Sequence, residues 1–316
     1  MNLVVGTRGS ALALWQANWV RDRLVLSRHA AEINIIQTSG DREARPAPAA
    51  AGVKGLFIKE IEEALLQQTI DLAVHSLKDL PLEQPPGLVI AAICGREDAR
   101  DALVCRAGVL PDGTGGSAGR FADLPAGARV ATGSLRRLAQ LRHLRPDLEY
   151  VPIRGNVDTR LRKLDAGECD ALVLAAAGLL RLGFDERIAE FFDPGQLCPA
   201  PGQGALAIET RADNARGNLS AARAAGALED RTTRLATRAE RAVVWALGAD
   251  CSSPVGACAL PAGGSLSLTA VVASPDGSRL IRASASGALT RPEELGTQVA
   301  DDLVRQGARE ILDHLA

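Results

Sequence analysis

Arginine and hydroxyl side chains recur where a strand-like run of residues gives way to a helix-like run. Arg8 and Ser10 follow the first such run, and Arg136 and Arg137 begin a later helix-like segment. Arginine binds carboxylates and phosphates through two parallel N–H donors, so these positions suit a ligand with several acidic groups. The same kind of junction also carries Lys78, Thr132, Ser134, Arg154 and Arg160.

Arg136 and Arg137 fall in the first turn of their predicted helix, where a cation opposes the helix dipole. This placement lowers the stability of the helix unless an anion lies between these arginines and the helix. The alternative is that both are solvated surface side chains.

Asp79 stands beside Lys78 at the end of another strand-like run. A carboxylate among cations stays ionised and can stabilise positive charge that develops on a bound substrate. The structural alternative is that Asp79 caps the turn before Pro81. We expect the nearby His75 to be a hydrogen-bonded structural histidine rather than a base.

Cys251 lies in a polar loop after a long helix-like segment, where a thiol is accessible enough for covalent attachment; the alternative is a passive thiol. The six cysteines form no C-x-x-C pair and the four histidines are dispersed. We therefore predict no structural zinc site and no other metal site.

The composition excludes several classes of protein. The 316 residues are 47% hydrophobic and 23% charged, which is typical of a globular chain of two or three domains. A net charge of -2 gives no general surface for nucleic acid or anionic lipid, and 3% aromatics exclude stacking platforms for single strands. Without a signal-peptide pattern or a long apolar run, we expect a cytoplasmic protein that binds neither membrane nor nucleic acid.

The predicted elements alternate between strand and helix, which is typical of an α/β fold. A first β-α-β-α-β series occupies residues 3–79, with a Pro/Ala/Gly-rich loop at 43–55. After a Gly-rich break at 108–119 the same series returns, and the apolar run 205–208 leads back to the first lobe. The last part has a long helix, a hairpin around Pro275-Asp276-Gly277 and a final helix.

We therefore predict two α/β lobes and a smaller C-terminal α+β domain. The first lobe spans residues 1–97 and is completed by about 203–222, the second spans 98–202, and the C-terminal domain with Cys251 spans 223–316.

Seven runs, in order along the whole chain, closely resemble the porphobilinogen deaminase (hydroxymethylbilane synthase) family. They are TRGSALALWQA (7–17), KGLFIKEIEEALL (54–66), DLAVHSLKDLP (71–81), GSLRRLAQL (133–141), IRGNVDTRLRKLDAGECDALVLAAAGLLRLG (153–183), PGQGALAIE (201–209) and DCSSPVG (250–256). Gly133, Asp158, Ser252, Ser253 and the segment 108–119 are the departures from its common pattern.

The resemblance implies a cytoplasmic, monomeric transferase of porphyrin, tetrapyrrole and heme biosynthesis, with two periplasmic-binding-protein-like lobes. It implies a dipyrromethane cofactor, made from substrate and joined by a thioether to Cys251. Four porphobilinogen molecules would be deaminated and condensed head to tail, and hydrolysis would release hydroxymethylbilane and ammonia. The product would pass to uroporphyrinogen-III synthase or be released.

The resemblance also implies roles for individual residues. Asp79 matches the catalytic aspartate, while Lys54, Phe57 and Gln203 are expected at the border or lid of the site. The expected cofactor- and substrate-binding residues are Arg8, Ser10, Lys78, Thr132, Ser134, Arg136, Arg137, Arg154 and Arg160. We expect them to face one cleft between the lobes.

Three alternatives remain. One is an interaction module at residues 223–316, which would leave Lys78, Asp79 and the arginines unexplained. A noncatalytic solute-binding protein shares the two lobes and an anion-binding cleft, but it would carry no covalent group. A phosphate-handling transferase is disfavoured because the sequence contains no Walker-type loop.

Overall fold

The computed structural model describes residues 2–37, 58–109, 119–212, 219–250 and 252–314. Lys54, Phe57, Cys251 and the predicted loop 43–55 lie outside these ranges. The chain divides into two compact units, residues 1–96 with 205–234 and residues 97–204 with 235–316. The predicted domain limits stay a prediction.

The first unit is built on a five-stranded sheet in the order β2-β1-β3-β10-β4. Strands β1, β2 and β3 are parallel, whereas β10 is antiparallel to both of its neighbours. The run at 205–208 does return to this sheet, as predicted. The elements are β1 (Asn2–Thr7), α1 (Ala11–Leu26), β2 (Ala30–Ile35), α3 (Lys59–Leu66), β3 (Leu72–Ser76), the 3₁₀ turn η2 (Leu77–Asp79), β4 (Leu88–Ile93), β10 (Leu206–Arg211) and α7 (Leu219–Gly226).

Each face of this sheet has its own core because strand side chains alternate between faces. Helices α1 and α7 cover the face that carries Leu3, Val5 and Leu72, and α3 covers the other. Ser10 caps α1, since its Oγ accepts a hydrogen bond from Ala13 N. The buried residues of α1 are Gln16, Ala17, Val20 and Leu24.

The second unit contains a sheet in the order β7-β6-β8-β5-β9, with the same pattern of strand directions as the first. Helix α4 covers one face, and α5 and α6 cover the other. The predicted repeat of an α/β lobe is confirmed. The elements are β5 (Asp101–Cys105), η3 (Phe121–Asp123), β6 (Arg129–Ala131), α4 (Leu135–Leu144), β7 (Glu149–Val151), α5 (Val157–Asp165), β8 (Ala171–Ala175), α6 (Ala176–Arg181), η4 (Asp185–Arg187) and β9 (Glu190–Phe191).

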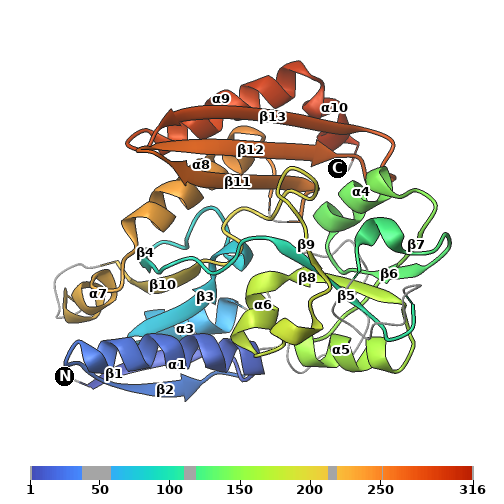
Figure 1. Ribbon diagram of the computed structural model, residues 1–316. Helices are drawn as coiled ribbons and strands as arrows, with labels where there is room; N and C mark the ends of the chain where they lie inside the picture. The colour runs from blue at the N-terminus through green and yellow to red at the C-terminus, as the bar shows by residue number, and fades with distance from the viewer. Residues whose placement is uncertain (1, 38–57, 110–118, 213–218, 251, 315–316) are drawn as a thin grey trace. The chain divides into compact units, whose positions relative to one another are not determined.

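The same unit also contains a three-stranded antiparallel sheet, β11-β12-β13, with α9 lying across it (Figure 1). The predicted hairpin is β12 and β13, and β11 is a strand that the sequence did not predict. The elements are α8 (Arg231–Ala246), of which residues 235–246 belong to this unit, β11 (Val255–Ala262), β12 (Ser265–Ala273), β13 (Leu280–Ala288), α9 (Pro292–Arg305) and α10 (Ala308–Asp313). The predicted fold class, two α/β lobes with a smaller α+β domain, is confirmed. None of the helices in the described ranges is long and apolar enough to cross a membrane.

Candidate active site

Four of the predicted site residues lie at one edge of the first unit's sheet. Arg8 and Ser10 follow β1, and Lys78 and Asp79 follow β3. Because β1 and β3 are parallel neighbours, their carboxyl ends meet at the same edge. Asp79 and Lys78 are both half-buried. The structure thus brings a carboxylate, two cations and a hydroxyl to this edge.

Buried contacts fix the turn that carries Asp79. Leu77 and Leu80 on either side are 1% and 2% exposed, and Leu77 N donates to Ala205 O at 3.0 Å. At the end of β3, Gln16 Nε2 donates to Ser76 Oγ at 2.9 Å, which ties α1 to this strand. These contacts leave the Asp79 backbone little freedom.

His75 lies beneath the same edge, buried against Glu209 of β10. Its Nε2 is 3.1 Å from Glu209 Oε2, as expected of a hydrogen-bonded structural histidine. Glu62 of α3 is close enough to be affected: burial and the Glu209 carboxylate raise the Glu62 pKa, and His75 partly opposes the rise. The pair connects two strands whose partners are 134 residues apart in sequence.

The second unit gathers six more predicted residues at the corresponding edge of its own sheet. Thr132 and Ser134 follow β6, and Thr132 Oγ1 accepts from Ser134 N at 3.4 Å. Ser134 is the N-cap residue of α4, but its side chain makes no capping hydrogen bond. The remaining members follow β6 and β7, which are parallel neighbours; they are Arg136, Arg137, Arg154 and Arg160.

Arg154 and Arg160 differ in their surroundings. Arg154 is exposed, whereas Arg160 is half-buried and its Nε donates to Gly155 O at 2.7 Å. A Cβ added to Gly133 would lie 3.9 Å from Arg160 Nη2 and 2.8 Å from Ile153 O. Arg160 therefore reaches the loop between β6 and α4, and a side chain at Gly133 would require the Ile153 carbonyl to shift.

Arg136 and Arg137 are not solvated side chains. They are 4% and 5% exposed, and both donate to the fully buried carboxylate of Asp101. Arg136 Nη1 lies 2.7 Å from Asp101 Oδ2, and Arg137 Nε lies 2.9 Å from Asp101 Oδ1. On α4 the two arginines are therefore buried together with Leu141, whereas Leu135 and Leu138 are only half-buried.

An anion was expected between these two arginines and the start of the helix. That anion is the side chain of Asp101. Burial would raise the Asp101 pKa, but the two guanidinium groups and the Gln203 amide outweigh it and hold the pKa at about 2. Gln203, expected at the border of the site, is fully buried, and its Nε2 donates to Asp101 Oδ1 at 2.9 Å. Its border role stays a prediction.

Asp101 and Arg181 are buried charged residues that were not predicted from the sequence. Arg181 ends the apolar helix α6, is 8% exposed and donates to Gly204 O at 2.7 Å. The available signal was a charged residue at the end of an apolar run, Asp101 before residues 102–105 and Arg181 after residues 171–180. Such a residue either closes a surface element or needs a buried partner, and only the fold distinguishes the two.

The loop around Cys251 is organised by Asp250, although Cys251 itself is not described. Asp250 Oδ1 accepts from Ser252 N at 2.8 Å and from Ser253 N at 3.0 Å. Burial would raise the Asp250 pKa, but these serine hydrogen bonds lower it. The other five cysteines are buried free thiols. Their burial shields these five thiols from covalent modification.

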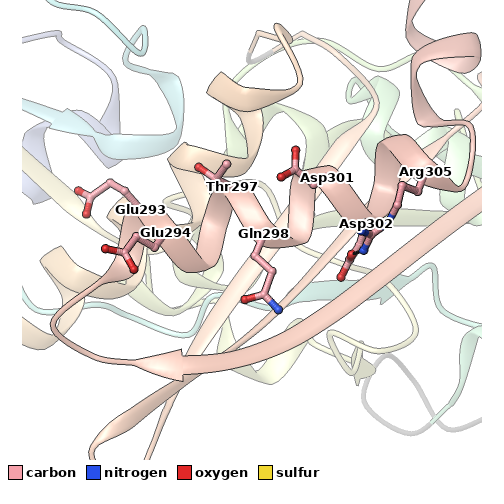
Figure 2. Close-up of a pocket in the computed structure, with 7 residues that line it drawn as sticks. All are labelled: Glu293, Glu294, Thr297, Gln298, Asp301, Asp302 and Arg305. Carbon is pink, nitrogen blue, oxygen red and sulfur yellow. Dashed lines mark hydrogen bonds and ion pairs between the residues drawn. The ribbon is translucent and has the colours of Figure 1, made fainter.

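A pocket of about 510 Å³ runs along α9, and none of the predicted site residues is among the residues that line it. Figure 2 shows its lining side chains projecting from this one helix. Four of them are carboxylates: Glu293, Glu294, Asp301 and Asp302. An acidic lining repels a ligand with several carboxylates, so this pocket does not suit the predicted ligand.

Two family models match the chain. The porphobilinogen deaminase dipyrromethane cofactor-binding domain matches residues 3–218, and the porphobilinogen deaminase C-terminal domain matches residues 234–305. Among solved structures, a periplasmic substrate-binding protein of an ABC transporter from Coxiella burnetii is similar at a TM-score of 0.43 and 13% identity, over 72% of this chain and 91% of that one.

Curated relatives match over nearly the full length. Porphobilinogen deaminase from Thermus thermophilus is 49% identical over 98% of both chains. The proteins of that name from Desulforudis audaxviator and Pelobacter propionicus are 50% and 47% identical, over 98% and 99% of this chain and 96% and 97% of theirs. The matched length includes both sheet edges and the Cys251 loop.

Proposed function

The chain belongs to the porphobilinogen deaminase family, and from this premise we propose which of its residues carry out the reaction. The family activity is the stepwise deamination and head-to-tail condensation of four porphobilinogen molecules on a covalent dipyrromethane primer. Hydrolysis then releases hydroxymethylbilane. The enzyme is a transferase of tetrapyrrole biosynthesis.

The residues of the second unit suit a ligand of this chemistry. Each ring of dipyrromethane carries an acetate and a propionate, so the cofactor is a polyanion. Arg136 and Arg137 share the carboxylate of Asp101, so these three residues together carry a net charge of +1. In addition, Arg136 Nε has no acceptor among the described residues. We assign these two arginines, with Thr132, Ser134, Arg154 and Arg160, to holding the acidic side chains of cofactor and substrate.

We assign Cys251 as the attachment point of the cofactor. Its support is the matched C-terminal motif and the burial of the five other thiols. When bound, the dipyrromethane supplies the free pyrrole carbon to which the first substrate unit is added.

We assign Asp79 as the catalytic carboxylate. Its carboxylate accepts hydrogen bonds from pyrrole N–H groups and stabilises the positive charge that develops on porphobilinogen as ammonia leaves. Lys78, Arg8 and Ser10 lie at the same sheet edge and bind substrate carboxylates. The observation that carries this assignment is a half-buried aspartate held by a rigid turn at the carboxyl end of β3.

Intact-mass measurement tests the attachment point. Purified protein should carry a covalent mass excess equal to a dipyrromethane, and Cys251→Ala should lack it. Cys169→Ala is the control, because Cys169 is 1% exposed and should leave the excess in place. A Cys251→Ala protein with the full mass excess would overturn the assignment.

Three further proposals concern the location, assembly and product of the protein. We infer a cytoplasmic monomer whose product is passed to uroporphyrinogen-III synthase or released. Light scattering of the purified protein should give the mass of one chain, 33.0 kDa. A stable dimer at micromolar concentration would contradict the monomer.

A further inference from the structure

Asp101 is the hub of a fully buried network in the second unit. Its Oδ2 accepts from Arg136 Nη1, while its Oδ1 accepts from Arg137 Nε at 2.9 Å and from Gln203 Nε2 at 2.9 Å. Arg136 Nη2 adds a longer contact of 3.3 Å. No atom of Asp101 is exposed to solvent. A carboxylate so placed touches no ligand, yet it fixes two side chains that we assign to ligand binding.

The fold explains why Asp101 reaches these arginines. Strand β5 runs antiparallel to β8, and its first residue Asp101 pairs with Ala175, the last residue of β8. The start of β5 therefore lies at the edge where β6 and β8 end and α4 begins. Two adjacent arginines in the first turn of α4 would otherwise be buried cations that oppose the helix dipole.

The network also fixes how each guanidinium is turned. Arg136 Nη1 donates to Cys198 O at 2.6 Å besides Asp101, which sets the plane of its guanidinium. Arg137 Nη2 donates to Gln203 Oε1 at 3.3 Å, and Gln203 is itself held by Ala99 O at 2.7 Å. A planar guanidinium binds a carboxylate well only in a narrow range of orientations.

We propose that Asp101 is the positioning residue of the Arg136–Arg137 pair: it holds both guanidinium groups for the acidic side chains of the pyrrole ligand. The inference rests on the proposed function of those arginines. Asp101 also neutralises one of the two buried arginine charges. Asp101, Arg136 and Arg137 together therefore keep a net charge of +1, which attracts a carboxylate. Asp101 is not a catalytic residue, because it acts through the arginines.

Asp101→Asn tests the proposal, because it keeps the shape and removes the charge. The matched control is Asp170→Asn, at the residue just before strand β8 of the same sheet. Asp170 also bridges two arginines, with Arg106 Nη2 at 2.9 Å and Arg129 Nε at 3.3 Å, but it precedes β8 and so lies at the opposite edge. A merely structural carboxylate should behave alike at both edges.

The first readout does not depend on activity. Apoprotein made in cells that lack porphobilinogen is treated with phenylglyoxal, and modified arginines are located by peptide mass. In Asp101→Asn, Arg136 and Arg137 should react about tenfold faster than in the parent, because each loses a charged hydrogen bond. In Asp170→Asn their rate should be unchanged.

The second readout is the rate at which apoprotein gains covalent mass when porphobilinogen is added. Asp101→Asn should load about tenfold more slowly, while Asp170→Asn should load within about twofold of the parent. Thermal unfolding of each variant records the loss of stability separately. If Asp101→Asn does not fold, Gln203→Met removes the amide that holds Asp101, and it should change both rates in the same direction.

The outcomes separate the two proposals. If the parent gains no covalent mass, the proposed function fails. If the parent loads and Asp101→Asn, or Gln203→Met in its place, loads at the same rate with unchanged arginine reactivity, only the positioning role fails. Equal slowing in Asp101→Asn and Asp170→Asn would also overturn it, because the effect would then be one of stability.

Discussion

Asp101 and Asp79 are both aspartates, but their surroundings suit them to different roles. Asp101 is fully buried and is held by two arginines and an amide, so its charge is already used within the protein. Asp79 is half-buried on a short turn, so its carboxylate can still meet a substrate. The chemistry of the side chain is the same, and the burial decides its use.

Asp79→Asn should lower kcat by about 10²–10³, because an amide cannot stabilise the developing cation as a carboxylate does. The thermal unfolding midpoint should stay close to that of the parent. The measurement is the initial rate of hydroxymethylbilane formation. The control is Asp22→Asn, at an exposed aspartate paired with Arg21, which should keep full turnover. A near-normal rate in Asp79→Asn would show that Asp79 is not the catalytic carboxylate.

The lowered pKa of Asp101 predicts how the stability of the protein depends on pH. Its pKa falls from 3.8 to about 2 on folding, so its contribution is complete above pH 4 and is lost as the pH drops from about 4 to 2. The full loss is about 2 kcal/mol. Urea unfolding of apoprotein between pH 5 and 3 should therefore show a shallower pH slope in Asp101→Asn than in the parent, and an equal slope would contradict the prediction.

Strand direction decides which residues share an edge of each sheet. Parallel strands β6 and β8 end where antiparallel β5 begins, so residues from three distant parts of the chain meet there. Gly204 belongs to the connection that supports this edge: its O accepts from Arg181 Nη2 and from Glu97 N. Its φ of +87° favours glycine, and an added Cβ would lie 2.4 Å from Glu97 O.

Gly204→Ala should therefore destabilise the protein through both backbone strain and a clash. Gly167→Ala is the matched control, with a φ of +80° and no atom within 4 Å of the added Cβ. Strain alone costs about 1–2 kcal/mol, and we expect Gly204→Ala to lose at least about 2 kcal/mol more than the control in urea unfolding. Equal losses would mean that the Glu97 backbone moves aside freely.

In the whole molecule, the second α/β lobe and the C-terminal sheet form one compact unit. Glu240 of α8 is fully buried and joins them, since its Oε2 accepts from Gly202 N at 2.7 Å and its Oε1 from Ala259 N at 2.8 Å. At the far end of α4, Arg142 Nη1 donates to Pro275 O at 2.8 Å in the hairpin turn. The lobe and the sheet should thus unfold together.

Glu240→Ala should lower the free energy of unfolding of this unit by about 2–4 kcal/mol, because two buried N–H groups lose their acceptor. Hydrogen exchange should speed up at Gly202 and along β11, while β1 of the first unit keeps its protection. Glu293→Ala, at an exposed glutamate of α9, is the control and should change neither. Uniform acceleration across both units would show that the glutamate does not act locally.

The sequence alone determined the alternation of strands and helices, the repeat of two α/β lobes, the hairpin at Pro275-Asp276-Gly277 and, through ordered motifs, the family. These features depend on local periodicity and turn residues, which a linear chain records directly. Only the tertiary structure paired Arg136 and Arg137 with Asp101, 35 and 36 residues away, and His75 with Glu209, 134 residues away. A buried charge is stable only with a partner, and the partner is chosen by strand order and direction rather than by sequence spacing.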